Sequence, residues 1–359
     1  MKIEELDKNF KIDTNISREG LKFLSVKDGI FDIYGCYSTD EDGLFVRMPH
    51  DVAKEVNECV DALAKHTAGI RVRFKTDSPY IALKIKYPNI LLMNHMPVSG
   101  IAGFDIYALE DGEYRHLKTA IPAYGNGPSD FEMLHEVGER KMRDYLIVFP
   151  LYNEVNEVYV GIDENSEIFS GSKYKNNVPI VYYGSSITQG ACASRPGNAY
   201  QEIVSRRLDL DYINLGFSGG AKAEPKMIEY LKNLDMSCFV MDYDYNAPSL
   251  EHLEKTHLPM YKEMRKAHID IPFVLMSRPV CRHFEAAVKA KEIIKATYDY
   301  AVKSGDTNIY NIDCSQIFSD MIADSWCVDE VHPNDLGFME IANAVTKVLG
   351  NVIDDILKN

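Results

Sequence analysis

The stretch PIVYYGSSITQG, residues 179–190, decides the fold of the second half of the chain. Its first five residues form a short apolar run, which is typical of a strand buried on both faces of a sheet. Small residues and hydroxyls follow at once, and they suit a tight turn from a strand into a helix. We therefore expect a buried parallel strand that ends at an exposed hydroxyl side chain.

The same alternation continues to the end of the chain. Short apolar runs are followed by longer segments in which apolar residues have helical spacing. Strands are predicted at 179–183, 212–215, 238–241, 272–276 and 309–312, and helices at 199–208, 225–234, 249–267, 286–303 and 335–349. Buried strands that alternate with helices predict a three-layer α/β domain of flavodoxin-like type, in which a doubly wound parallel sheet lies between two layers of helices.

The first half has a different rhythm. Ile70, Val72 and Phe74 alternate with basic residues, which is typical of a half-buried strand. Residues 51–66 instead have helical spacing. We predict a β-sandwich with one helical insertion, a polar joint at 170–177, and two domains at residues 1–172 and 173–359.

Composition narrows the function classes. The 359 residues carry 39 basic and 54 acidic side chains, so the formal net charge is −15. A surface this acidic argues against nucleic acid and anionic membranes as partners. The seven cysteines are scattered without a C-x-x-C pair, which indicates free, mostly buried thiols. Because the N-terminus also shows no secretory signal pattern, we expect a cytoplasmic protein.

Candidate chemistry lies where the predicted strands end. Ser186, between Gly184 and Gly190, is a candidate nucleophile; its alternative role is that of a helix-capping serine. A phosphate-binding loop is excluded because no lysine follows Gly190. A rival nucleophile is Ser218, since residues 216–220 match the G-x-S-x-G pattern of α/β-hydrolases.

Acidic and basic residues follow later strands. Asp242 and Asp244 are either a paired-carboxylate or metal site, or solvated side chains at a strand end. Arg278 either binds substrate or neutralises these acids. Asp329 precedes His332 by three residues, a spacing that allows the carboxylate to bond the imidazole and fix its tautomer. The alternative is a surface aspartate beside a loop histidine.

In this order, the blocks resemble those of the SGNH hydrolases, also called the GDSL family of esterases and lipases. The resemblance covers residues 178–349 and is most specific in the first block and in the closing D-x-x-H-P block. It implies that Ser186 is the nucleophile, that His332 is the general base and later the general acid, and that Asp329 orients His332.

The same resemblance implies an oxyanion hole. Its donors would be the backbone N–H groups of Ser186 and Gly219 and the side-chain amide of Asn246. The chain departs from the family pattern twice: Ser185 stands where the family has aspartate, and Asn246 lacks its usual flanking glycine and aspartate. In that arrangement the segment containing Ser218 supplies an oxyanion donor, which favours Ser186 as nucleophile.

The first half carries a second resemblance. Residues 103–107, GFDIY, are similar to the G-x-D-L-Y signature of a β-rich domain that precedes some SGNH hydrolases. This implies a jelly-roll-like accessory domain next to the active site. Asp105 and Tyr107 are either structural or in contact with substrate.

The two resemblances lead to a serine esterase that hydrolyses small acyl esters, acetyl esters above all, on carbohydrates. No metal or organic cofactor is required, and the expected partners are a small acyl ester and a second copy of the chain. Two alternatives stay open. The same residues would serve an acyltransferase, and a relict hydrolase domain would serve a non-catalytic carbohydrate-binding protein.

Overall fold

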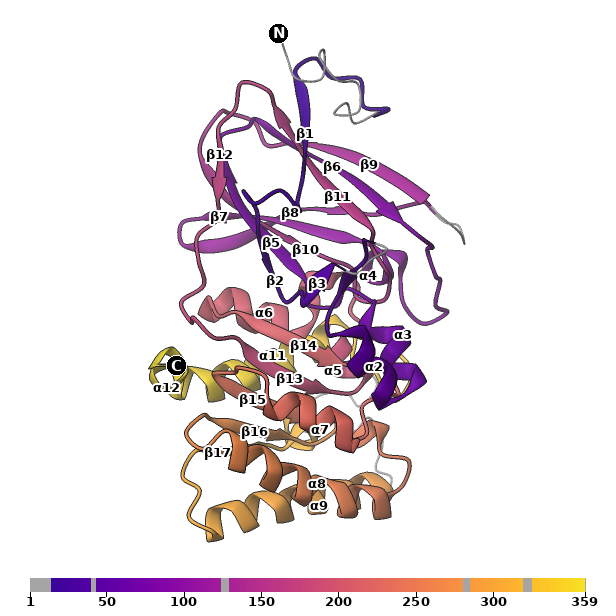
Figure 1. The fold of residues 1–359 in the computed structure, drawn as a ribbon, viewed down its shortest axis with the longest axis vertical. Helices are drawn as coiled ribbons and strands as arrows, with labels where there is room; N and C mark the ends of the chain where they lie inside the picture. The colour runs from indigo at the N-terminus through magenta and orange to yellow at the C-terminus, as the bar shows by residue number, and fades with distance from the viewer. Residues whose placement is uncertain (1–13, 40–42, 124–128, 280–284, 319–324, 359) are drawn as a thin grey trace.

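The computed structural model describes residues 14–39, 43–123, 129–279, 285–318 and 325–358. An antiparallel β-rich domain, formed by the first half, stands on an α/β domain formed by the second half (Figure 1). The predicted fold class, with a β-rich N-terminal part and an α/β C-terminal part, is confirmed.

The N-terminal domain contains two antiparallel sheets. One has the order β1-β11-β6-β9, and the other the order β12-β5-β10-β7-β8 with β2 beside β5. The strands are β1 (Leu21–Ser25), β2 (Asp32–Tyr34), β5 (Arg71–Thr76), β6 (Tyr80–Tyr87), β7 (Phe104–Glu110), β8 (Glu113–Ala120), β9 (Ser129–Glu136), β10 (Arg143–Val148), β11 (Glu157–Asp163) and β12 (Ile168–Ser170), with a separate short pair β3 (Ser38–Thr39) and β4 (Phe45–Val46). Apolar residues of both sheets share one core, as expected of a β-sandwich.

The helical insertion differs from the prediction. Two helices, α2 (His50–Val56) and α3 (Glu58–Ala64), replace the single helix expected over 51–66. Asn57 separates them in an extended conformation, and its side chain accepts a hydrogen bond of 2.9 Å from the backbone N–H of Val60. An asparagine that caps a helix satisfies a backbone donor that would otherwise lack a partner, so a new helix begins there.

The alternating pattern of β5 also has an unexpected outcome. Arg71 and Arg73 are two of the basic residues on the second face of this strand, which was predicted to be half-buried. Both are fully buried because the second domain covers that face. Arg71 forms an ion pair with Asp211 and donates to the Tyr174 hydroxyl at 2.7 Å, and Arg73 pairs with Asp209 at 2.9 Å. Buried charges of this kind need such partners. The basic face of β5 is therefore part of the contact between the two halves.

The C-terminal domain contains a parallel sheet of order β14-β13-β15-β16-β17. Its strands are β13 (Ile180–Gly184), β14 (Tyr212–Gly216), β15 (Cys238–Asp242), β16 (Phe273–Met276) and β17 (Ile309–Ile312). Its long helices are α6 (Tyr200–Leu208), α7 (Pro225–Lys232), α8 (Leu250–Ala267), α9 (Glu285–Lys303) and α11 (Asp335–Asn351). Its short helices are α5 (Ser186–Gln189), α10 (Cys314–Ile317) and α12 (Ile353–Lys358). A further short helix, α4 (Val98–Ile101), belongs to the N-terminal domain. The predicted parallel sheet is confirmed.

Successive residues of β13 point to two separate cores. Tyr182 packs in the cluster that contains α6 and α11, and this cluster is continuous with the core of the β-sandwich. Val181 and Tyr183 pack in a second cluster with α7, α8 and α9. The sheet is thus covered on both faces, which explains why its strands are apolar throughout.

Cysteine chemistry differs from the prediction at one position. The free thiols are Cys36, Cys59, Cys192, Cys238 and Cys314. Cys327 is disulfide-bonded, so the expectation of free thiols throughout is wrong there, and Cys281 lies outside the described residues. The missing C-x-x-C spacing excluded only pairs that are close in sequence.

Among the described helices, none has the length and apolarity that crossing a bilayer requires.

Candidate active site

Ser186 is the first residue of α5, directly after β13. The side chain of the preceding Ser185 accepts a hydrogen bond of 3.2 Å from the backbone N–H of Ile187, so Ser185 is the helix-capping serine. The first N–H groups of a helix have no acceptor within it. Ser186 therefore combines a side-chain hydroxyl with a backbone donor at the carboxyl end of β13.

A chain of hydrogen bonds joins three of the predicted residues. The Ser186 Oγ atom lies 2.8 Å from His332 Nε2. On the other side of the ring, His332 Nδ1 lies 2.8 Å from Asp329 Oδ2 and 3.0 Å from Asp329 Oδ1. The fold thus brings together residues that are 146 positions apart.

The loop before α11 holds Asp329 in place. Its carboxylate accepts hydrogen bonds from the backbone N–H groups of His332 and Val331, at 2.9 and 3.3 Å, besides the bond to the ring. Burial raises the pKa of Asp329, but the hydrogen bonds and charge of His332 outweigh burial and bring the pKa below its ordinary value. The carboxylate stays ionised and can orient the imidazole.

Gly219 and Asn246 come together at the ends of β14 and β15. The backbone N–H of Gly219 donates to Asn246 Oδ1 at 3.0 Å, and Asn246 Nδ2 donates to the carbonyl of Phe217 at 2.8 Å. The Gly219 N–H, which the family resemblance predicted as an oxyanion donor, is thus bonded to Asn246 in this structure. A side-chain amide has two N–H donors, so Asn246 has a second one besides that used by Phe217.

Gly216, at the end of β14, allows this loop to approach α5. A Cβ atom on Gly216 would lie 2.2 Å from the backbone nitrogen of Gln189. Gln189 Oε1 in turn accepts from the backbone N–H of Ser218 at 3.0 Å. Any side chain at position 216 would push the loop away from α5, and with it the candidate oxyanion donors.

The other candidates have internal partners. The backbone N–H of Ser218 donates to Gln189 Oε1, and its carbonyl accepts from the Cys59 thiol at 3.2 Å. Asp242 is buried and accepts from Thr188 Oγ1 at 3.0 Å, and the buried Asp244 pairs with Arg278 at 2.9 Å. The two acids are therefore not solvated, and Arg278 neutralises Asp244.

Comparison with known families identifies the chain. The profile of the GDSL-like lipase/acylhydrolase family matches residues 177–350. A second profile, the GxDLY domain found at the N-terminus of SGNH-hydrolase-type esterases, matches residues 21–168. The chain belongs to the two-domain SGNH hydrolases. The family predicted from the sequence motifs is confirmed, and the enzyme is a carboxylic ester hydrolase.

Solved structures share both domains. A protein from Bacteroides ovatus described as a GDSL-like lipase has a TM-score of 0.82 and 25% identity, covering 93% of this chain and 98% of its own. The salicylyl-acyltransferase SsfX3 of a tetracycline biosynthetic pathway has a TM-score of 0.75 and 18% identity, with the same coverage. The acetyl xylan esterase Est2A of Butyrivibrio proteoclasticus has a TM-score of 0.56 and 10% identity, covering 93% and 100%. No curated protein sequence matches the chain.

The G-x-D-L-Y-type motif of this SGNH hydrolase joins the two domains. The fully buried Asp105 accepts from Arg195 at 2.7 Å and from the backbone N–H of Gly197 at 2.8 Å. The hydroxyl of Tyr107 also accepts from Arg195. The motif therefore binds the segment after α5, which contains Arg195 and Gly197, to the N-terminal domain.

The N-terminal domain also brings a residue to the site that the sequence analysis missed. His95 lies in the segment before α4, and its ring centroid is 5.6 Å from that of His332. Cys192, which follows α5, is buried close by; burial and the Asp329 carboxylate raise the pKa of its thiol to about 12. Neither residue lies in a motif. His95 reaches the site through the packing of the two domains, and Cys192 reaches it through the contact between its own segment and the loop before α11.

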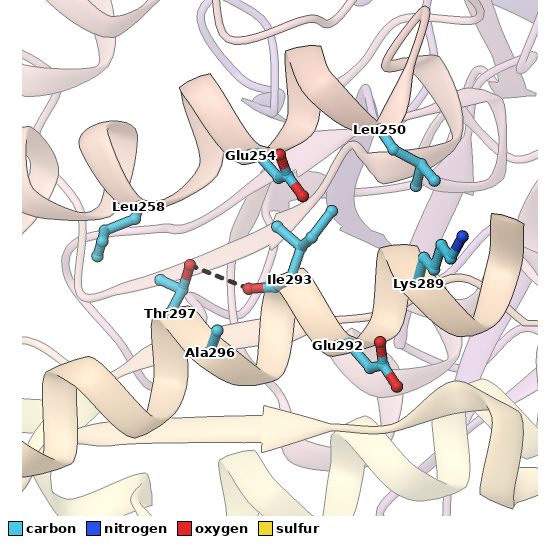
Figure 2. A pocket seen from close by; sticks show the side chains of 8 residues that line it. All are labelled: Leu250, Glu254, Leu258, Lys289, Glu292, Ile293, Ala296 and Thr297. Carbon is cyan, nitrogen blue, oxygen red and sulfur yellow. Dashed lines mark hydrogen bonds between the residues drawn. The ribbon is translucent and has the colours of Figure 1, made fainter.

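A hollow of about 530 Å³ lies elsewhere, between α8 and α9 (Figure 2). Leu250 and Leu258 line it from α8, and Ile293 and Thr297 from α9. It includes none of the residues in the hydrogen-bonded chain at Ser186.

The remaining histidines near strand ends have separate roles. His252 hydrogen-bonds to the backbone carbonyl of Lys222 at 2.9 Å. His257 is buried, with Nδ1 2.8 Å from Thr297 Oγ1 and its ring stacked on Tyr243. His283 lies outside the described residues.

His257 makes stability depend on pH. Burial lowers its pKa to about 3, whereas an unfolded histidine titrates near 6.5. As the pH falls below about 6.5, His257 becomes protonated in the unfolded chain but stays neutral in the folded protein. The free energy of unfolding therefore decreases until about pH 3. We expect the loss of unfolding free energy between pH 7 and pH 5 to be about 2 kcal/mol smaller in His257→Gln than in the wild type.

Urea unfolding at both pH values measures this difference. The control is His50→Gln, because the His50 side chain is 57% exposed. An equal pH dependence in the two variants would contradict the assignment to His257.

Proposed function

We propose that Ser186, His332 and Asp329 act as a catalytic triad that hydrolyses small acyl esters, most of all acetyl esters of carbohydrates, through an acyl-enzyme. The observation that carries the proposal is the continuous hydrogen-bonded chain from Ser186 Oγ through the imidazole to the Asp329 carboxylate. A serine hydroxyl is a weak nucleophile until a base takes its proton.

The geometry supports a step-by-step account. His332 Nε2 takes the proton of Ser186 Oγ as the oxygen attacks the ester carbonyl, and Asp329 stabilises the imidazolium. The tetrahedral oxyanion accepts hydrogen bonds from the Ser186 N–H and from Asn246. The imidazolium then gives its proton to the leaving alcohol. Water, deprotonated by His332, attacks the acyl-enzyme and releases the acid and the free serine.

The substrate class rests on a different argument. Est2A, an acetyl xylan esterase, has the same two-domain fold, which supports a carbohydrate acetyl ester as the first substrate to test. The acyltransferase SsfX3 shares the fold as well. Product analysis with a high concentration of an acceptor alcohol separates the two reactions: unchanged release of free acid supports hydrolysis, and acylated alcohol supports transfer.

Active-site labelling tests the proposal. The folded protein is treated with a serine-reactive phosphonate, and the modified peptide is identified by mass spectrometry. We expect the label on Ser186. A label on Ser218, or no label on a folded protein, would overturn the triad.

Removing Asn246 should affect the reaction rate more than binding. Asn246→Ala deletes a donor for the oxyanion, and such donors contribute about 10²–10³-fold to kcat. We expect a decrease of this size with a small change in KM, measured with p-nitrophenyl acetate. Asn343→Ala, on the outer face of α11, is the control. A decrease below about tenfold would exclude Asn246 from the oxyanion hole.

A further inference from the structure

Three side chains with metal-binding atoms meet beside Ser186. His95 comes from the N-terminal domain, Cys192 from the segment after α5, and His332 from the loop before α11. One ligand atom of each lies within 4.8 Å of the ligand atoms of the other two. The cluster shares His332 with the proposed triad, but His95 and Cys192 have no part in the reaction as derived above.

The segments that carry these residues are fastened to one another. The backbone N–H of Cys192 donates to the carbonyl of Pro333, next to His332, at 3.1 Å. On the other side, a Cβ atom on Gly100 of α4 would lie 2.3 Å from the carbonyl oxygen of Ala193, so only glycine allows this approach. The backbone segments that carry Cys192 and His332 are therefore held together, and α4 of the N-terminal domain packs against the residue after Cys192.

The chemistry of the three ligands is that of a zinc site. Imidazole nitrogen and thiolate sulfur are the ligands that Zn²⁺ prefers, and three protein ligands leave a position for water. The hydrogen bond from His332 Nδ1 to Asp329 leaves Nε2 as the ligand atom. A carboxylate behind a coordinating histidine is a recurrent arrangement at metal sites. The charges of one thiolate and one carboxylate would balance those of the ion.

We propose that His95, Cys192 and His332 bind a Zn²⁺ ion, and that the bound ion inhibits the esterase reversibly. On binding, the Cys192 thiol releases its proton to solvent, and the lone pair of His332 Nε2 goes to the metal. That nitrogen then has no lone pair for the proton of Ser186. The inhibition rests on the proposed function, whereas the binding of the ion does not.

Binding is measured first, without reference to activity. The full chain is freed of metal with a chelator and dialysed against zinc chloride, and bound zinc is determined by mass spectrometry. We expect one ion per chain, and at least ~10-fold weaker binding in His95→Ala and in Cys192→Ser. With Co²⁺ as the probe, we expect a thiolate-to-metal charge-transfer band that Cys192→Ser lacks. Unchanged zinc binding in both variants would overturn the site.

Inhibition is measured next with p-nitrophenyl acetate, each variant being compared with its own rate in the absence of zinc. We expect zinc to inhibit the wild type, a chelator to restore the rate, and inhibition to need at least ~10-fold more zinc in the two variants. Cys36→Ser and His50→Gln are the controls and should behave as the wild type. Zinc bound without inhibition would overturn the inhibitory role. Zinc bound by a protein that hydrolyses no ester would instead overturn the proposed function and leave the site intact.

Discussion

Replacing Ser186 with alanine should lower kcat/KM for p-nitrophenyl acetate by about 10⁴-fold or more. Without the hydroxyl, the acyl-enzyme cannot form, and the bond of 2.8 Å to His332 Nε2 is lost. The remaining groups act only on a water molecule. Initial rates at saturating and at low substrate concentration measure the effect, with circular dichroism to show that the variant is folded.

Ser218→Ala is the matched control for this experiment. Both serines follow a strand of the parallel sheet, but the His332 imidazole bonds to the hydroxyl of Ser186. We expect Ser218→Ala to keep most of the activity. If Ser218→Ala loses the activity and Ser186→Ala keeps it, the nucleophile is Ser218 and the proposed triad is wrong.

The position of Ser186 has a physical reason, because it follows a recognisable buried strand and the carboxyl ends of parallel strands meet at one edge of the sheet. Asp329 and His332 lie in the loop before α11, and their roles were predicted from the resemblance of the closing D-x-x-H-P block. The hydrogen bond between Gly219 and Asn246 could not be predicted. It depends on how two loops fold against each other, and no local pattern describes that contact.

The parts of the fold that were missed depend on contacts between the two domains or on single residues. Period-two alternation identified β5, but the same pattern suggested a solvent-facing side where Arg71 and Arg73 are buried. Alternation says which residues share a face, and it does not say what covers that face. The position of His95 could not be predicted for the same reason, because its approach to His332 follows from the packing of one domain on the other.

Asp105→Asn should lower the free energy of unfolding by about 3–5 kcal/mol, the usual result of removing one partner of a buried ion pair. The Asp105 side chain is fully buried, and it accepts from Arg195 and Gly197 in the other half of the chain and from Thr119 at 2.6 Å. Burial raises the pKa of Asp105, but the hydrogen bond from His116 and the charge of Arg195 bring it below its ordinary value. An asparagine keeps the shape, but it replaces one accepting oxygen with a donor and leaves Arg195 without its counter-charge.

Urea unfolding measures this loss, and Asp111→Asn is the control, because the Asp111 side chain is 89% exposed. That control should change stability by about 0.5 kcal/mol or less. The experiment also decides between the two roles left open for the G-x-D-L-Y-type motif. If Asp105 is structural, the folded variant keeps its KM at low temperature, because no substrate contact has been removed. If the stability of Asp105→Asn equals that of the control while KM rises, the carboxylate contacts substrate. The contact between the two domains is then stabilised by the other hydrogen bonds of this interface.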